Sequence, residues 1–389
     1  MEDFVYYTPT KVYFGKGKEN EVGAIVAGYG FKTVMVQYGR GSVKKSGLYD
    51  RVMSSLKAAG ITVVEMGGVE PNPKVEFVRK AVKLCREAGV ELVLAVGGGS
   101  VIDSCKFTAL GAVNDCDVWD IPSRKYAPDK ALPVAAIITH AAAGSEMSGS
   151  AVLTNMAENM KRGFGSDLNR CLFSICNPEL TYTVGKYQTA CGIVDLMTHT
   201  IERYFTLCPP TPLTDRLAEG LLVSVIEAGR KVMEDPEDYE ARATILWASS
   251  LAHNDLTGCG REQLLAVHQL EHALSGEYDH VAHGAGLAVL YPAWARYVYR
   301  EDAPRFAQFA RRVWGVEEPD DETAAKLGIE AMAAYFAELG MPTCLRDFGV
   351  AEESLPKLAE LCTYHGTRVV KSYIPLDYDT SLSIFKSCY

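Results

Sequence analysis

The chain has 389 residues, 48% of them apolar and 23% charged, which is the balance of a globular protein with about two domains. Its net charge of −10 argues against a general nucleic-acid surface, because phosphate binding needs clustered lysine and arginine. No run reaches the roughly 18 uninterrupted apolar residues of a membrane helix, and the first residues lack the basic and then apolar pattern of a signal peptide.

Short runs of β-branched residues alternate with helical patterns through the first half of the chain. Such alternation predicts a mainly parallel sheet with helices on both faces. The predicted strands are 32–37, 61–66, 91–97 and 132–138, and the predicted helices between them are 46–60 and 73–89.

The pattern changes after about residue 185. Long segments of helical periodicity follow, including 189–205, 215–233 and 261–276, and no convincing strand appears. We therefore predict an α/β domain over 1–184 and an all-helical domain over 185–389, with the boundary near Thr183 to Lys186. Because no low-complexity linker separates them, we expect the two domains to pack directly and form a cleft.

Three glycines, Gly97-Gly98-Gly99, and Ser100 join the apolar strand 91–97 to a helical pattern. Without Cβ atoms, this turn lets backbone N–H groups approach an anion, and the helix N-terminus adds partial positive charge. A pyrophosphate is the natural occupant, although the motif is neither GxGxxG nor a Walker A loop. A plain tight turn is the structural alternative.

Two further loops follow predicted strands. After 32–37 the chain has Gly39, Arg40, Ser42, Lys44 and Lys45, with no acidic residue. NAD-specific sheets commonly place an acid there for the ribose 2′-hydroxyl, whereas a 2′-phosphate needs cations and hydroxyls, so this loop favours NADP over NAD. The alternative is a solvated basic turn. After 132–138, the small residues between Thr139 and Ser145 would let the chain pass beneath a flat ring.

Metal-ligand residue types recur at helical spacing in the second half. Asp195 and His199 are four residues apart, His268 and His272 repeat that spacing, and His283 follows in a predicted loop. Imidazoles with one carboxylate suit Fe²⁺ or Zn²⁺. Spacing alone does not say which four of the five residues bind or which metal is held, and a lone histidine on an apolar helix is more often a core residue.

At these residues the chain resembles the iron-containing (group III) alcohol dehydrogenase family, especially its butanol dehydrogenase and NADPH-dependent aldehyde reductase branch. The motifs GGGSVID, GSEM, DLMTH and HG occur in the family's order, and the resemblance covers nearly the whole chain, fading in the last fifty residues. It implies a dehydroquinate-synthase-like fold, with a Rossmann-like coenzyme domain followed by a metal-binding helical domain.

The resemblance also implies roles for individual residues. The metal ligands would be Asp195, His199, His268 and His283, and His272 would line the active site without binding the metal. The implied coenzyme residues are Gly39, Ser42, Lys44, Gly98, Gly99, Ser100, Asp103, Thr139, Ser145 and Lys161, the last on a β-hairpin. Two features depart from the family: AAAGSE replaces the usual TxGTGSE, and the segment from His268 to His283 is one residue longer, which brings His280 near the last ligand position.

The expected reaction is hydride transfer between NADP, or NAD, and a small alcohol or aldehyde such as butanol or butanal, with the metal as Lewis acid and His272 as a proton relay. An NAD-linked, glycerol-type polyol dehydrogenase is the alternative within the class. A dehydroquinate-synthase-like lyase would need more basic residues around the ligands, and a non-enzymatic sensor would not need both sites intact.

The remaining expectations concern surroundings and partners. Eleven scattered cysteines, without a CxxC pair or an export signal, favour reduced thiols and a cytoplasmic location. The family resemblance implies a homodimer or a larger homo-oligomer. We expect no nucleic-acid partner and no membrane partner.

Overall fold

The computed structural model describes all 389 residues and divides at Val184 into two units. One unit is Tyr7–Val184, and the other is Gly185–Tyr389 together with Met1–Tyr6. The first six residues accompany the second unit, where the Glu2 amide donates to the Gly260 carbonyl (2.8 Å).

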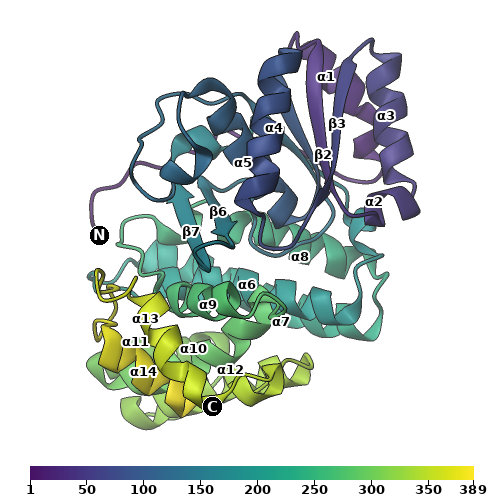
Figure 1. Ribbon diagram of the computed structural model, residues 1–389. Helices are drawn as coiled ribbons and strands as arrows, with labels where there is room; N and C mark the ends of the chain where they lie inside the picture. Colours follow the sequence, from purple (N-terminus) through teal and green to yellow (C-terminus); the bar gives the residue numbers. More distant parts are fainter. The chain divides into compact units, whose positions relative to one another are not determined.

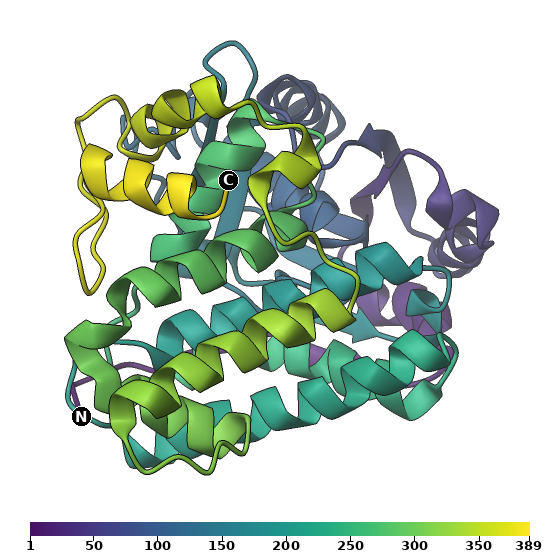
Figure 2. The same cartoon turned by 90° about the horizontal axis from the view of Figure 1, so that it is seen from below.

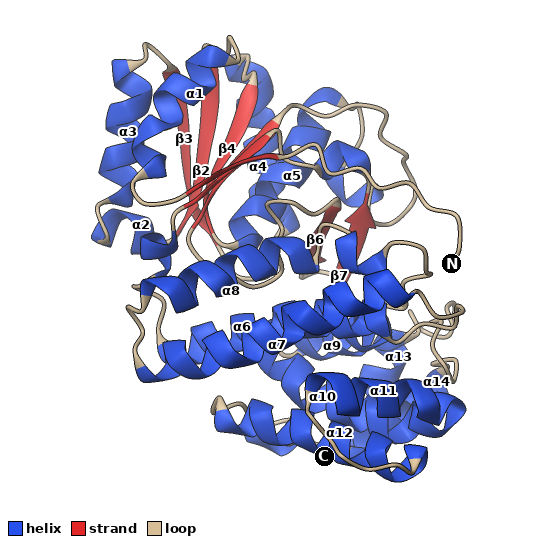
Figure 3. Ribbon diagram, turned by 180° about the vertical axis from the view of Figure 1, so that it is seen from behind, coloured by secondary structure: helices blue, strands red, loops and turns tan.

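A parallel sheet forms the centre of the first unit, as Figure 3 shows in red, and its strand order is β1-β8-β5-β4-β2-β3. A separate antiparallel hairpin consists of β6 and β7. The strands are β1 (Lys11–Phe14), β2 (Thr33–Gly39), β3 (Thr62–Val69), β4 (Leu92–Gly97), β5 (Val134–Ile138), β6 (Ser150–Asn155), β7 (Met160–Gly165) and β8 (Phe173–Cys176).

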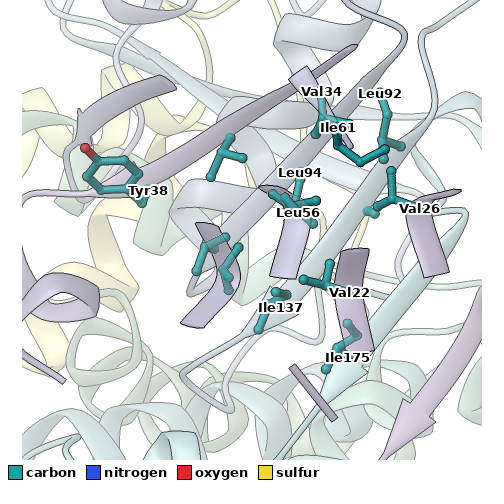
Figure 4. Close-up of a cluster of buried hydrophobic side chains, with 14 of the residues drawn as sticks. Val22, Val26, Val34, Tyr38, Leu56, Ile61, Leu92, Leu94, Ile137 and Ile175 are labelled. Atoms are coloured by element: carbon teal, nitrogen blue, oxygen red, sulfur yellow. The ribbon is translucent and has the colours of Figure 1, made fainter. Parts of the chain in front are cut away.

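Helices cover both faces of this sheet because its strands are buried on both sides (Figure 1). The helices of this unit are α1 (Val22–Gly28), α2 (Ser42–Lys45), α3 (Leu48–Ala58), α4 (Val75–Ala88) and α5 (Gly99–Val113). Side chains of alternate strand residues, such as Val34, Leu94 and Ile137, pack with Val26 and Leu56 of α1 and α3 (Figure 4).

The opposite face of the sheet carries the intervening residues and is covered by α4 and α5. There the buried Gln37 side chain donates to Thr108 (3.0 Å) and accepts from Ser104 (2.9 Å), both on α5. These hydrogen bonds hold α5 against β2 and so set the position of its N-terminus. The predicted mainly parallel sheet with helices on both faces is confirmed.

The second unit consists of helices, which Figure 2 shows from below; its only strand-like pairing is an isolated bridge between Val370 and Leu376. Its helices are α6 (Lys186–Tyr204), α7 (Pro212–Glu234), α8 (Tyr239–Ala252), α9 (Ala266–Glu277), α10 (His283–Val298), α11 (Ala303–Val313), α12 (Asp321–Glu338), α13 (Leu355–Cys362) and α14 (Tyr378–Ser387). Helix α6 is buried almost throughout and contacts α7, α8 and α10.

Several element boundaries differ from the predictions. The four-residue strands β1 and β8 were not predicted, because each is too short to show a clear pattern. Helix α9 begins at Ala266 rather than near 261.

All eleven cysteines are free thiols, and Cys85, Cys105 and Cys191 lie buried within helices. None of the helices combines the length and the apolar character that crossing a membrane would take.

Candidate functional site

Four predicted metal ligands lie together in the second unit. The Nε2 atoms of His199, His268 and His283 lie 3.4, 3.7 and 3.8 Å from Oδ1 of Asp195. The ligand atoms of Asp195, His199 and His268 all lie within 4.8 Å of one another, and those of Glu271, His272 and His283 form a second such group. Four ligands at about 2.1 Å from a tetrahedral ion would be about 3.4 Å apart, so the three distances to Asp195 are in the range for a shared cation.

Helix geometry accounts for this convergence. Asp195 and His199 are one turn apart on α6, so their side chains share a face. His283 is the first residue of α10, and the prediction that it lies in a loop is therefore wrong. A Cβ on the next residue, Gly284, would lie 2.0 Å from the Cys191 carbonyl oxygen of α6. Glycine at this position lets α10 approach α6 closely enough for His283 to reach Asp195.

Two carboxylates that were not predicted as site residues orient the imidazoles. Glu202 contacts Nδ1 of His268, and Glu271 contacts Nδ1 of His283. A carboxylate on Nδ1 favours the tautomer in which Nε2 carries the lone pair for a metal. Spacing could have indicated Glu202, which lies seven residues after Asp195 on the same face of α6.

Glu202 also caps a helix. Its Oε1 accepts from the backbone amides of Val267 (2.6 Å) and His268 (3.4 Å) in the first turn of α9, whose preceding residue provides no side-chain cap. The amides of a helix N-terminus stabilise a carboxylate. A single buried side chain on α6 therefore fixes both the start of α9 and the ring of His268.

The electrostatics of the cluster favour a positive ion. Asp195, Glu202 and Glu271 are 4%, 2% and 0% exposed, and their ion pairs are with histidine rings. Burial lowers the pKa of His268, but the carboxylates of Glu202 and Asp195 outweigh burial and raise this pKa to about 9. A site that favours protonation of an imidazole among carboxylates also favours a metal cation in the proton's place.

Hydrogen bonding gives a second indication of fit. Oδ1 of Asp195 and Nε2 of His268 are buried and form no hydrogen bond. Leaving such atoms unsatisfied is costly unless they bind something. Burial, followed by the neighbouring imidazoles and Arg203, lowers the pKa of His199 well below its usual value, which keeps that ring neutral. The donor set thus fits a divalent Fe²⁺ or Zn²⁺ ion.

The other histidines near this cluster differ in position. The half-buried His272 has its ring centroid 5.7 Å from that of His283 and 6.4 Å from that of His268. His280, which the longer segment brought near the ligand position in sequence, is exposed and contacts the Phe348 carbonyl (2.9 Å) through Nε2. His253, which no sequence pattern singled out, stacks on His199.

In the first unit, the sheet brings the predicted coenzyme loops together. Strand β2 pairs with β4 so that Tyr38 lies beside Val96, and β4 pairs with β5 so that Gly97 lies beside Ile138. The loops after Gly39, Gly97 and Ile138 therefore leave the same edge of the sheet. The chain reverses its strand order between β2 and β4, and parallel sheets bind nucleotides at such a switch point.

The three glycines of the turn have different surroundings. A Cβ on Gly97 would lie 2.6 Å from Val101, and one on Gly98 would lie 3.3 Å from His140. A Cβ on Gly99 would have nothing within 4 Å. Gly97 and Gly98 thus satisfy packing, whereas Gly99 leaves open space at the N-terminus of α5. The first amides of a helix have no partner within the helix and are suited to an anion.

Asp103 and Ser145 are directed toward each other. The Ser145 hydroxyl donates to Asp103 (2.6 Å), whose second oxygen accepts from the amide of Val152 (3.0 Å). The buried Lys106 amine donates to the carbonyls of Ser145 (2.7 Å) and Ser148 (3.0 Å). These hydrogen bonds attach the 145–152 segment to α5.

Thr139 and Lys161 are placed by backbone pairing. The Thr139 amide donates to the Gly97 carbonyl (3.1 Å), which holds the loop after β5 beside the glycine turn. Lys161 is buried on the β6–β7 hairpin, opposite Thr154, and its positive charge helps to lower the pKa of Asp103, which burial raises overall.

The basic loop after β2 is only partly available to a ligand. Arg40 pairs with Glu70 (2.6 Å), and the Lys44 amine lies 3.3 Å from Glu65 and over the rings of Tyr38 and Tyr49. Both tyrosine hydroxyls contact Glu65.

Ser42 and Lys45 are exposed, and residues 42–45 of this basic loop form the short helix α2, which was not predicted. The charge of Lys44 is thus already balanced in part by an acid that lies 21 residues further along the chain.

The chain is similar to known proteins over nearly its whole length. The family model described as iron-containing alcohol dehydrogenase matches residues 9–178, and its C-terminal counterpart matches residues 189–389. The chain is 41% identical to NADH-dependent butanol dehydrogenase A of Clostridium acetobutylicum, and 36% identical to NADPH-dependent aldehyde reductase YqhD of Escherichia coli, each over 100% of both chains.

Among solved structures, the chain resembles NADH-dependent butanol dehydrogenase A of Thermotoga maritima, with a TM-score of 0.96 and 38% identity over 100% of this chain and 99% of that one. The chain therefore belongs to the iron-containing alcohol dehydrogenase family and is a metal-dependent, NAD(P)-linked alcohol dehydrogenase or aldehyde reductase.

Proposed function

We propose that this enzyme interconverts a small aliphatic aldehyde such as butanal and its alcohol, with NADPH as the preferred hydride donor. The observation that carries the proposal is the convergence of three imidazole Nε2 atoms on one oxygen of Asp195. The names of relatives that act on butanol or aldehydes support the substrate class. An NAD-linked polyol dehydrogenase is the alternative that the test must separate.

In this proposal, Asp195, His199, His268 and His283 hold one Fe²⁺ or Zn²⁺ ion, and Glu202 and Glu271 keep His268 and His283 in the required tautomer. When bound, the metal supplies Lewis-acid polarisation of the substrate oxygen, and the nicotinamide supplies or accepts the hydride.

His272 is the proposed proton carrier. It is half-buried, unlike the buried His268, and its ring lies 5.7 Å from that of His283. A half-buried imidazole beside the cluster is suited to exchanging a proton with both substrate and solvent.

For the coenzyme, we assign the pyrophosphate to Gly98, Gly99 and Ser100 at the N-terminus of α5. Gly39, Ser42 and Lys44 would receive the 2′-phosphate, since no acidic residue of the loop opposes it. Lys44 would have to exchange its contact with Glu65 for the phosphate, which predicts a moderate preference for NADPH rather than a strict one.

Two further proposals concern assembly and location. We propose a homodimer or larger homo-oligomer, which light scattering of the purified protein would measure. We also propose a cytoplasmic location, which is compatible with the scattered, free thiols.

The decisive experiment combines metal analysis of freshly purified protein with NADPH and NADH kinetics on butanal, and with NAD⁺ kinetics on glycerol. We expect one divalent ion per chain, loss of turnover after chelation, and a higher kcat/KM with NADPH than with NADH. Turnover that persists without metal would contradict the metal site, and activity confined to glycerol with NAD⁺ would replace the proposed substrate.

A further inference from the structure

The three histidines around Asp195 are not supported in the same way. Nδ1 of His268 contacts Glu202, and Nδ1 of His283 contacts Glu271. Nδ1 of His199 is buried and forms no hydrogen bond. A metal-binding imidazole without a partner on its second nitrogen can rotate away from its ligand orientation, so something else must restrain His199.

The His199 ring lies between two other imidazoles. The ring centroid of His253 lies 3.9 Å from that of His199, with 28° between the planes. The centroid of His268 lies 4.2 Å from that of His199, with 26° between the planes. A ring covered on both faces cannot turn about its Cβ–Cγ bond without displacing one of its neighbours.

The backbone that carries His253 is itself attached to His199. His253 follows the last residue of α8, and Asp255 lies two residues further, in a left-handed conformation (φ 73°). The buried Arg203 donates through Nη1 to the His199 carbonyl (2.8 Å), and its Nη2 lies 3.9 Å from Asp255. Arg203 thus links the turn after α8 to the turn of α6 that carries His199.

We propose that His253 is a positioning residue that holds the His199 imidazole in its metal-binding orientation by ring stacking. Stacking on His253 does for His199 what a carboxylate does for His268 and His283. This inference rests on the proposed metal site, but it concerns metal affinity rather than the choice of substrate. Because the restraint comes from a flat ring, a phenyl ring in place of the imidazole should provide it as well.

The test is the affinity of the full-length, metal-stripped protein for Zn²⁺ alone, measured by competition with a chromogenic chelator. We expect His253→Ala to weaken Zn²⁺ binding about threefold to tenfold, as expected for one aromatic pair. His253→Phe should stay within about twofold of the parent, and His253→Leu, which fills space without a ring, should resemble the alanine variant. His280→Ala, an exposed histidine outside the cluster, is the matched control and should leave Zn²⁺ affinity unchanged.

Two results would overturn the stacking role of His253. Equal losses in His253→Phe and His253→Ala would show that a ring nitrogen is required and would overturn the stacking role. Unchanged Zn²⁺ affinity in His253→Ala would overturn it as well. A parent protein that binds no Zn²⁺ would instead defeat the proposed metal site. Far-UV circular dichroism and thermal unfolding of the metal-free variants identify any that fail to fold, and in that case the Phe and Leu variants carry the comparison.

Discussion

The proposed metal cluster of the second unit and the basic loop after β2 differ in whether their charged groups already have partners. In the cluster, buried carboxylates face imidazoles, and the Asp195 Oδ1 atom remains without a hydrogen bond. In the loop, exposed Lys44 and Arg40 already pair with Glu65 and Glu70. The cluster therefore gains most from a cation, whereas the loop must give up a contact to accept an anion. From residue type alone, the two sites would have been judged equally able to bind an ion.

Removal of a proposed ligand from the cluster should have the largest effect. His268→Ala should abolish metal binding and turnover, because it removes one of four donors and leaves Glu202 without its imidazole. NADPH binding, measured by fluorescence titration, should persist, because the proposed coenzyme residues belong to the other unit.

Elemental analysis of the purified variant checks the metal, with His280→Ala as the control outside the cluster. Full turnover by a His268→Ala protein that contains no metal would refute the assignment.

A second, smaller effect is expected at the glycine turn. Gly99→Val should fold normally, since a Cβ there has nothing within 4 Å, but its side chain would occupy the proposed pyrophosphate position. We expect dissociation constants for NADPH and NADH to rise together by about tenfold to a hundredfold.

Gly28→Val is the matched control, because Gly28 also has open space around its Cβ position and lies at the end of α1, away from the loops after β2, β4 and β5. Equal coenzyme binding by Gly99→Val and the parent would remove the anion site from this turn.

The smallest effect should appear at Lys44. Lys44→Ala should raise the KM for NADPH about fivefold while changing that for NADH little, because only the 2′-phosphate loses a charged partner. Glu65→Gln should act in the opposite direction by removing the acid that competes for Lys44. Lys83→Ala, an exposed lysine on α4, serves as the control. Equal changes for both coenzymes would show that Lys44 does not contact the 2′-phosphate.

How much of the fold could be predicted varied with the length of each element. The long β-branched runs gave β2 to β5, and the helical periodicity after residue 185 gave the second unit. Strands β1 and β8 were not predicted because four residues are too few to show alternation. The start of α10 at His283 was not predicted because the close contact of Gly284 with Cys191 is a tertiary feature that residue spacing does not reveal.

Within the candidate site, residue pairs on a single helix could be predicted, whereas contacts between elements could not. Spacing on α6 and α9 indicated Asp195 with His199 and His268 with His272, since each pair lies within one helix. Which four atoms converge depends on how three helices pack, and His253 becomes a neighbour of His199 only through the turn after α8. The Lys44–Glu65 pair was missed because it joins a short helix to a strand that follows in the chain.

Glu202 connects the first turn of α9 to one of the proposed metal ligands. The same carboxylate accepts hydrogen bonds from the first amides of α9 and contacts Nδ1 of His268. The order of that turn and the orientation of the proposed ligand therefore depend on one side chain. In the proposed metal site, loading of the ion and completion of the helix would therefore be thermodynamically linked, each favouring the other. Fraying of this turn would then also weaken binding of the proposed metal ion.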